Sequence, residues 1–255
     1  MSYSVFLDLD GTLIAPEEDT ISQRTVDALK QAQNNGHKIF LNTGRSLAEL
    51  KIDAFRGFRF DGYLCGCSYI TAGGRILMAD RLTADELQPI TAHFYGRDIP
   101  VVLEGEDAVY AVYTDETNAE EQGMIPLTDM SEVFRICELE PITKMSIFAN
   151  LGKEDLEFIR SLADPIERND TICTEVVPKG HDKAYVMNKT VEYLNLDPTT
   201  VIAIGDSSND FAMLDAAPIS VAMGNAADEV KSRTTYTTVP VTEDGVAVFL
   251  EKFLK

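Results

Sequence analysis

The stretch Val5-Phe6-Leu7-Asp8-Leu9-Asp10-Gly11-Thr12-Leu13 decides the fold and the chemistry of this chain. Its apolar residues predict a buried strand, and burying a charged group without a partner is costly. Residues i and i+2 of an extended backbone share one face, so the carboxylates of Asp8 and Asp10 can point into one small volume. Gly11 then lets the chain turn sharply away from the end of the strand.

Two carboxylates at this spacing need a cation, a shared proton or a substrate that exploits the difference between them. We interpret Asp8 as a nucleophile and Asp10 as its acid/base partner, and we expect a divalent metal ion to make the pair tolerable. A strand-end Asp that caps the following turn is the structural alternative, and it is common for a single Asp.

Composition sets the class of protein and excludes several partners. The 255 residues suffice for one large domain or two modest ones with a full core. The formal net charge of -20 repels nucleic acid phosphates and anionic membranes, so we exclude both as main partners. Four irregularly spaced cysteines predict no disulfide framework. The N-terminus has no signal-peptide pattern, and no apolar stretch approaches the ~20 residues of a membrane span, so we expect a cytoplasmic protein.

Continuous apolar strands alternate with helical segments near both ends of the chain. These segments are a strand at 3–9, a helix at 22–35 capped by Ser22, a strand at 38–42, a helix after Gly44, a helix at about 181–195, a strand at 201–205, a helix at about 209–216 and a strand at 219–222. The alternation predicts an α/β fold, a Rossmann-like core with a parallel sheet covered on both faces.

The middle of the chain has a different pattern. Thr83-Ala84-Asp85-Glu86 is a capping-box signal for a helix that reaches about Phe94. Runs of two-residue periodicity follow at 100–104, 107–113, 142–149 and 171–177, with a helical stripe of Leu156, Ile159 and Leu162 between the last two. Adjacent strands without intervening helices predict an antiparallel sheet. We therefore expect a catalytic core of residues 1–80 and 179–255 and an inserted α+β cap domain of residues 81–178.

Three further segments place polar residues at or just beyond the ends of core strands, where open parallel sheets bind ligands. In the first, the Thr43 hydroxyl and the adjoining amides can hydrogen-bond a phosphoryl oxygen, and Gly44 permits close approach. Arg45 follows directly and is a candidate for substrate contact. A Thr-Gly pair after a strand is also a common turn, which remains the structural alternative.

The second segment carries Lys183, which falls in the first turn of a predicted helix. A cation there opposes the helix dipole by ~0.3–1 kcal/mol unless an anion lies nearby. Lys183 can hold both the nucleophile and the transferring phosphoryl group, and a solvated lysine is the alternative.

The third segment ends an apolar strand with Asp206, and Asp210 follows at a helix start. Mg²⁺ prefers one or two carboxylates plus waters and substrate phosphate, a set that Asp8 and Asp206 supply. Asp210 can instead be favoured by the helix N-terminus, where Ser208 or Asn209 can act as the cap.

Together these residues describe phosphoryl transfer through an aspartyl-phosphate. Asp8 attacks phosphorus and Asp10 protonates the leaving oxygen, while Mg²⁺, Lys183 and Thr43 neutralise charge on the phosphoryl group. Asp10 then takes a proton from the water that hydrolyses the intermediate.

The ordered motifs resemble those of the haloacid dehalogenase-like superfamily, in particular its Cof-like phosphatases, which are magnesium-dependent hydrolases of phosphorylated metabolites. The motifs are Asp8-x-Asp10-Gly11-Thr12, Thr43-Gly44-Arg45, Lys183 and Gly205-Asp206-x-x-Asn209-Asp210. The resemblance implies that the insert is a cap that closes over the site and selects the substrate. It also implies phosphate contacts from Thr43, Gly44, Lys183 and Asn209, and a metal ion bound by Asp8, the Asp10 carbonyl, Asp206 and, from nearby, Asp210.

Two positions depart from the family pattern. Gly66-Cys67-Ser68-Tyr69 stands where the Cof-like pattern has Asn-Gly, which leaves open whether Cys67 or Ser68 takes the role of that Asn. Ala184 follows Lys183 in place of the usual Gly, and a helix tolerates Ala better.

We expect hydrolysis of a small phosphorylated metabolite, such as a sugar phosphate or a similar phosphomonoester. A phosphomutase with the same acid pair is the first alternative, and a non-catalytic, receiver-like phospho-acceptor is the second. Receivers are about half this length and carry no cap. In the insert, Glu104, Glu106, Tyr110 and Tyr113 are candidates for contact with the leaving group, with core or solvated roles as alternatives. Neither the substrate nor the oligomeric state follows from the sequence.

Overall fold

The computed structural model describes residues 1–112, 116–167 and 172–254. The chain divides into two compact units, and the chain passes between them more than once. The first unit comprises Met1–Gly44, Lys51–Leu77 and Asp182–Lys255. The second unit comprises Arg45–Leu50 and Met78–His181.

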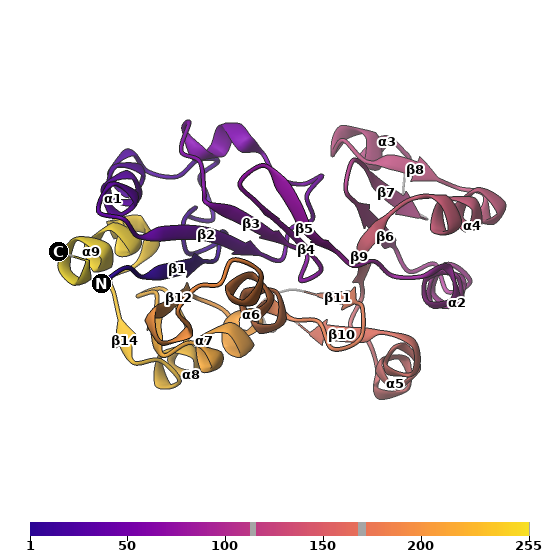
Figure 1. The fold of residues 1–255 in the computed structure, drawn as a ribbon. Coiled ribbons are helices and arrows are strands. Elements are labelled where there is room, and N and C mark those ends of the chain that lie inside the picture. Colours follow the sequence, from indigo (N-terminus) through magenta and orange to yellow (C-terminus); the bar gives the residue numbers. More distant parts are fainter. Residues whose placement is uncertain (113–115, 168–171, 255) are drawn as a thin grey trace. The chain divides into compact units, whose positions relative to one another are not determined.

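A sheet of eight described strands lies at the centre of the first unit (Figure 1). In spatial order its strands are β14 (Tyr236–Thr237), β13 (Ile219–Ala222), β12 (Val201–Gly205), β1 (Ser4–Leu7), β2 (Lys38–Thr43), β3 (Gly62–Cys65), β4 (Tyr69–Ala72) and β5 (Arg75–Ala79). Neighbouring strands from β14 to β3 run parallel, and β4 runs antiparallel to β3. All four residues of β1 are buried, as its composition predicts for a central strand.

Helices cover this sheet on both sides (Figure 1). They are α1 (Gln23–Asn34), α6 (Lys183–Tyr193), α7 (Phe211–Ala216), α8 (Asp228–Ser232) and α9 (Gly245–Phe253). Figure 1 shows α1 and α9 on one side of the sheet and α6 and α7 on the other. The predicted cap of α1 is present, because the Ser22 side chain accepts a hydrogen bond from the Thr25 amide. The predicted α/β class is confirmed.

The sequence predicts an α-helix after Gly44, and this prediction is wrong. The chain there makes isolated turns and then the short 3-10 helix η1 (Ile52–Phe55). The Glu49 carboxylate accepts hydrogen bonds from the amide and the hydroxyl of Ser46, at 2.8 and 3.0 Å. Arg56 and Gly57 follow with φ values of 48° and 74°, which end helical structure. Local side-chain bonds therefore replace the backbone ladder of a helix.

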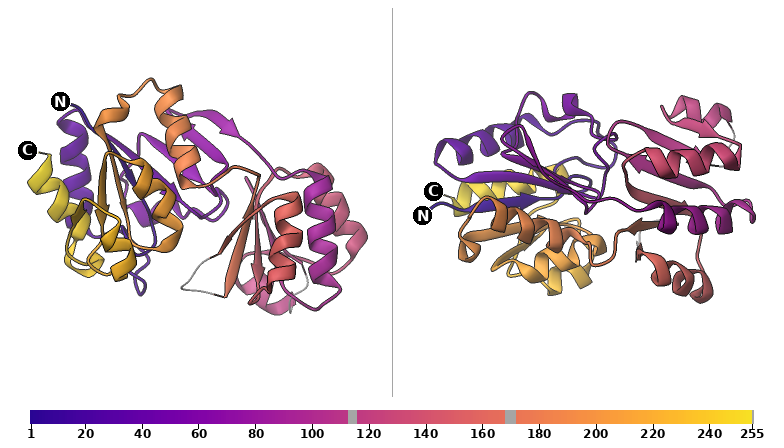
Figure 2. Two further views of the ribbon diagram at one scale, coloured as in Figure 1. Left: turned by 90° about the horizontal axis from the view of Figure 1, so that it is seen from below. Right: turned by 45° about the vertical axis from the view of Figure 1, so that its right-hand side comes forward.

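The second unit contains a largely antiparallel sheet with helices on one face. Its strands in spatial order are β10 (Asp164–Glu167), β11 (Cys173–Val177), β9 (Ile142–Phe148), β6 (Val101–Gly105), β7 (Val109–Val112) and β8 (Ile125–Leu127), and its helices are α2 (Ala84–Tyr95), α3 (Glu116–Glu121), α4 (Met130–Leu139) and α5 (Lys153–Leu162). The predicted capping box of α2 is present at Thr83 and Glu86. Figure 2 shows α2, α4 and α5 together on one side of the sheet. The predicted α+β pattern of the insert is confirmed.

The two faces of the second sheet differ in chemistry. One face packs apolar side chains such as Leu103, Met145 and Val176 against the helices. Residues that lie directly opposite each other on neighbouring strands point to the same face of the sheet. Glu104 on β6 and Lys144 on β9 are such a pair, and they lie on the other face. No helix within the described ranges combines the length and the apolar composition that crossing a membrane requires.

Candidate active site

Asp8 directly follows β1 and is 4 % exposed. Its amide donates a hydrogen bond to the carbonyl of Ile204 on β12, at 3.0 Å, so the chain continues the parallel pairing to this point. β1 lies between β12 and β2, so the residues that follow these three strands meet at one edge of the sheet.

Lys183 is the first residue of α6 and reaches into this edge. Its Nζ lies 2.6 Å from Asp8 Oδ1 and 2.6 Å from Asp210 Oδ1, and it donates to Asn209 Oδ1 at 3.5 Å. The side chain is 1 % exposed, so the alternative of a solvated lysine is wrong. Burial alone would lower the pKa of Lys183, but the carboxylates of Asp210 and Asp8 raise it well above its usual value. Lys183 therefore stays protonated.

The pKa of Asp8 is shifted in the direction that opposes ionisation. Burial raises the pKa of Asp8 well above its usual value, Lys183 lowers it, and the nearby charges of Asp210 and Asp206 raise it further. One lysine does not compensate three neighbouring carboxylates. An ionised Asp8 therefore needs additional positive charge close by.

Asp206 follows β12 and is held by the loop after β1. The Thr12 hydroxyl donates a hydrogen bond to Asp206 Oδ1 at 2.8 Å. Gly11 has a φ of 81°, and a Cβ atom at this position would lie 2.2 Å from Asp206 Oδ2. Only glycine therefore permits the backbone to approach Asp206 this closely.

Asp210 serves its own loop as well as Lys183. Its Oδ2 accepts hydrogen bonds from the amides of Asp206 and Ser207, at 3.0 and 3.1 Å. Its Oδ1 pairs with Lys183, and the residue is completely buried. The helix-start role and the active-site role therefore coexist in one carboxylate.

The residues present fit a divalent metal ion. Carboxylate oxygens of Asp8, Asp206 and Asp210 lie within 4.8 Å of one another. Oxygen-only ligands at this spacing suit a hard cation such as Mg²⁺. Asp10 is exposed and its carboxylate lies outside this group, which agrees with a contribution from its backbone carbonyl instead.

The phosphate-binding candidates Thr43 and Gly44 lie in the first unit, whereas the substrate-contact candidate Arg45 lies in the second. Thr43 ends β2 and is 1 % exposed, and Gly44 is the last residue of its segment in the first unit. Arg45 begins the segment that belongs to the second unit. The carbonyl of Thr43 accepts a hydrogen bond from the amide of Gly66, at 3.1 Å, which ties the end of β2 to the turn between β3 and β4.

That turn contains the departure from the family pattern. Gly66 and Cys67 both have positive φ, at 55° and 59°, and the amide of Ser68 donates to the carbonyl of Cys65. This is the geometry of a two-residue hairpin turn, in which Asn-Gly is favoured. A left-handed Cys costs roughly 1–2 kcal/mol, so the turn stores strain beside Thr43.

Three residues that sequence reasoning missed support the site. Thr12 binds Asp206, and its only signal was its place in the first motif. The Asn225 side chain donates to the carbonyl of Gly11 at 2.9 Å and accepts from the amide of Val241, and no sequence pattern indicates this role. Asn42 donates to the backbone of Lys183. The sequence feature that could have revealed this role is the presence of a polar residue in a strand predicted to be buried.

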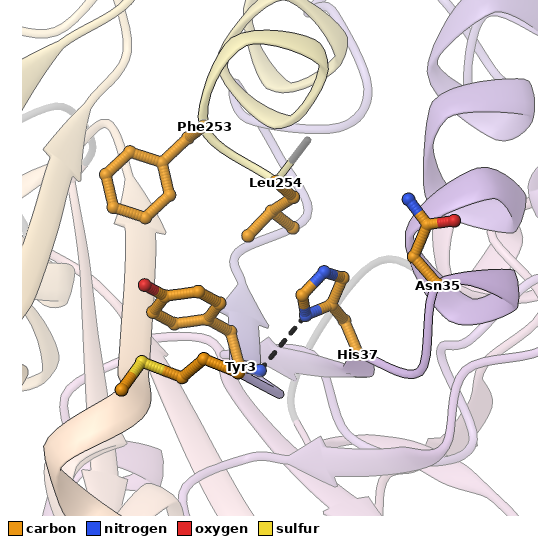
Figure 3. A pocket seen from close by; sticks show the side chains of 6 residues that line it. Tyr3, Asn35, His37, Phe253 and Leu254 are labelled. Carbon is orange, nitrogen blue, oxygen red and sulfur yellow. Dashed lines mark hydrogen bonds between the residues drawn. The ribbon is translucent and has the colours of Figure 1, made fainter.

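The first unit also has a pocket at the opposite ends of its strands (Figure 3). It has a volume of about 540 Å³, and its lining residues are Met1, Tyr3, Asn35, His37, Phe253 and Leu254. Tyr3 precedes β1, whereas Asp8 follows it, so the pocket is separate from the carboxylate cluster. Figure 3 shows the Tyr3 amide hydrogen-bonded to His37 Nδ1, at 3.0 Å. Burial and the N-terminal charge lower the pKa of His37, which favours this neutral acceptor.

A buried carboxylate beside a lysine and two further carboxylates that suit a hard cation fits the hydrolysis of phosphoric monoesters, and that is the class of enzyme that this fold and site define. The model of the haloacid dehalogenase-like hydrolases matches residues 5–250, so the chain belongs to that family. The resemblance predicted from the motifs is confirmed, and the protein is an enzyme rather than a non-catalytic receiver.

Relatives of similar size share this assignment. The chain is 29 % identical over 271 residues to the 5-amino-6-(5-phospho-D-ribitylamino)uracil phosphatase YitU of Bacillus subtilis (strain 168), covering 98 % of this chain and 97 % of the relative. It is 26 % identical over 269 residues to the pyridoxal phosphate phosphatase YbhA of Escherichia coli (strain K12), covering 98 % of each. The solved structure of BT1666, a phosphatase from Bacteroides thetaiotaomicron, superposes with a TM-score of 0.84 at 26 % identity, covering 99 % of this chain and 95 % of that one.

Proposed function

We propose that the protein is a Mg²⁺-dependent phosphatase that hydrolyses a small phosphorylated metabolite through an aspartyl-phosphate at Asp8. The observation that carries this proposal is the buried contact of Asp8 with Lys183, at 2.6 Å, inside a cluster of carboxylates fit for a divalent cation. A purely structural ion pair would not need two further acids at the same point.

In the first half of the reaction, a carboxylate oxygen of Asp8 attacks phosphorus. The bond from phosphorus to the leaving oxygen breaks, and Asp10 gives that oxygen its proton. Lys183 holds the nucleophile and a phosphoryl oxygen at once, while the Thr43 hydroxyl and the Gly44 amide contact other phosphoryl oxygens, with Asn209 beside them. In the second half, Asp10 takes a proton from the attacking water, phosphate leaves, and Asp8 is regenerated.

Asp8, Asp206 and the Asp10 carbonyl would hold the metal ion, with Asp210 assisting from nearby. Asp210 would also orient Asp206 and Lys183. When bound, Mg²⁺ supplies positive charge that compensates the carboxylates and the phosphoryl oxygens. Thr12 keeps Asp206 oriented toward this site through its hydrogen bond.

The domain roles are part of the same proposal. Residues 1–80 and 179–255 form the catalytic core, and the cap of residues 81–178 selects the leaving group, with Arg45 as a candidate for substrate contact. We propose a sugar phosphate or a similar phosphomonoester as the substrate class. The named relatives act on different phosphorylated compounds at comparable identity, so they support the phosphomonoester class rather than one compound.

Of the candidate cap residues, Glu104 is buried on the face of the sheet that carries Lys144, and Tyr110 packs in the apolar core on the opposite face. Tyr113 lies outside the described residues. The four cysteines are free thiols, which supports the proposal that the protein works in the cytoplasm.

The test is the substitution Asp8→Asn, compared with Asp19→Asn at an exposed position of the same unit. We expect Asp8→Asn to abolish hydrolysis of an aryl phosphate while its thermal unfolding stays cooperative, because an amide cannot attack phosphorus at a useful rate. Asp19→Asn should keep the wild-type rate. Turnover by Asp8→Asn would rule out Asp8 as the nucleophile. Isomerised product in place of free phosphate would favour the phosphomutase.

A further inference from the structure

Asn42 is a fully buried polar residue in the middle of an apolar region. It belongs to β2, next to the strand that leads to Asp8, and its side chain is 0 % exposed. Its sheet partner on β3 is the equally buried Leu64. A buried amide destabilises a fold unless its hydrogen bonds are made, so a residue of this kind in a central strand needs an explanation.

The side-chain amide of Asn42 connects β2 to the start of α6. Its Nδ2 donates to the backbone carbonyl of Lys183 at 2.9 Å and to the Sδ atom of Met213 on α7 at 3.1 Å. Its Oδ1 has no hydrogen-bond partner among the described residues. Reversing the amide would place Oδ1 against the Lys183 carbonyl, two acceptors face to face, so this orientation is fixed.

The orphaned oxygen shows that hydrogen bonding is only half satisfied at this position. An unsatisfied buried acceptor costs ~1–3 kcal/mol, and an apolar residue of the same shape would avoid that penalty. Stability alone therefore does not explain Asn42. What the residue provides is a contact with the first residue of α6.

The Lys183 side chain ends 2.6 Å from Asp8, but it has four rotatable bonds, and its reach depends on where its backbone lies. The Asp182 side chain caps the start of α6 by accepting a bond from the Tyr185 amide at 2.7 Å. Asn42 adds a second restraint that connects this start to β2. Thr43, the next residue along β2, is thereby held in register with Lys183.

We propose that Asn42 is a positioning residue that fixes the first turn of α6, so that Lys183 meets both Asp8 and the phosphoryl group in the transition state. This inference rests on the proposed function. A displacement of about 1 Å at a catalytic group lowers a rate by about 100-fold. Loss of the Asn42 restraint should therefore lower kcat more than it changes KM.

The test compares Asn42→Leu with Met213→Leu as the matched control. Asn42→Leu keeps the approximate shape and removes the donor, whereas Met213→Leu removes the thioether contact and leaves the bond to Lys183. We expect Asn42→Leu to lower kcat for an aryl phosphate by about 10- to 100-fold, with KM within about twofold of wild type. Its thermal midpoint should equal or exceed the wild-type value. Met213→Leu should keep the wild-type kcat.

A wild-type kcat in folded Asn42→Leu would overturn the inference, as would a loss of rate that follows the loss of folded protein. If Asn42→Leu does not fold, Asn42→Ser provides the same comparison with a shorter side chain that cannot span to Lys183. The inference and the proposed function fail separately. An active Asp8→Asn would defeat the function, whereas an inactive Asp8→Asn with an unaffected Asn42→Leu would defeat only the role of Asn42.

Discussion

Lys183 determines how much negative charge the edge of the core sheet can hold. It faces Asp8 and Asp210 at equal distances of 2.6 Å, and Asp206 adds a third carboxylate to the cluster. Because burial and the neighbouring acids raise the pKa of Asp8, ionising it works against folding when no further cation is bound. A divalent cation bound at this point would reverse that balance, because it would favour the ionised form of Asp8.

A substitution at Thr12 tests directly whether Asp206 is a metal ligand. Thr12→Val removes the hydroxyl that donates to Asp206 Oδ1 and keeps the volume of the side chain. Because residues behind a ligand fix its orientation, we expect the dissociation constant for Mg²⁺ to rise by about 10-fold or more. Titration calorimetry with Mg²⁺ measures the effect, and Thr237→Val at an exposed position is the control. An unchanged constant would show that Thr12 does not support the ligand.

The elements that could be predicted from the sequence are those whose type and ends are determined by residues within the element itself. β1 and β12 are uninterrupted apolar runs, β2 carries the apolar run Ile39–Leu41, and α1 and α2 have their own capping residues. The structure of the segment after Gly44 could not be predicted, although its residues favour a helix. The Glu49 side chain there accepts a hydrogen bond from the Ser46 amide and lies near Lys144, a residue far away in the sequence. The bond from Asn42 to Lys183 could not be predicted either, because the two residues lie 141 positions apart and Asn42 is not part of any of the motifs.

The junction of β12 with the following loop also permits a sharp test. A Cβ atom on Gly205 would lie 2.5 Å from Asp210 Cγ, closer than side chains approach in proteins. We expect Gly205→Ala to lower the free energy of unfolding by ~1–3 kcal/mol and to lower kcat, because Asp210 must move away from Lys183. Gly96→Ala is the control, because its Cβ meets only the Ala92 carbonyl at 3.5 Å. Urea unfolding and aryl phosphate turnover of both variants check the expectation. An active, wild-type-stable Gly205→Ala would contradict the geometry of the loop.

At the scale of the whole molecule, the second unit comprises Met78–His181 and, in addition, one short segment from the N-terminal part of the chain. The segment Arg45–Leu50 leaves the first unit immediately after the phosphate-binding candidates and belongs to the second. Glu49 on this segment lies 3.9 Å from Lys144, which also pairs with Glu104 at 2.9 Å and Glu175 at 3.5 Å. These contacts anchor a segment of the core sequence in the second unit, which no local pattern indicates.

This anchoring predicts a dependence of stability on pH. Burial alone would raise the pKa of Glu49, but the bond with Glu104 and the charge of Lys144 lower it to about 2. A depressed pKa contributes stability above the unfolded value of about 4.5, and the contribution disappears as the pH falls toward 2. We expect Glu49→Gln to be less stable than wild type at pH 7 by about 1 kcal/mol, after allowance for partial exposure.

Urea unfolding of both proteins between pH 7 and pH 2.5 measures this difference. The difference should shrink as the pH falls through that range. A constant difference, or one that grows in acid, would show that the ionised Glu49 carboxylate does not hold the segment.

The proposed mechanism depends most on one step, the transfer of the phosphoryl group to the carboxylate of Asp8. The enzyme should be mixed with substrate, quenched within one turnover and reduced with borohydride, which converts an aspartyl-phosphate to homoserine. We predict homoserine at position 8 and at no other aspartate when the peptides are examined by mass spectrometry. Homoserine at another position, or none while phosphate is released, would contradict the account.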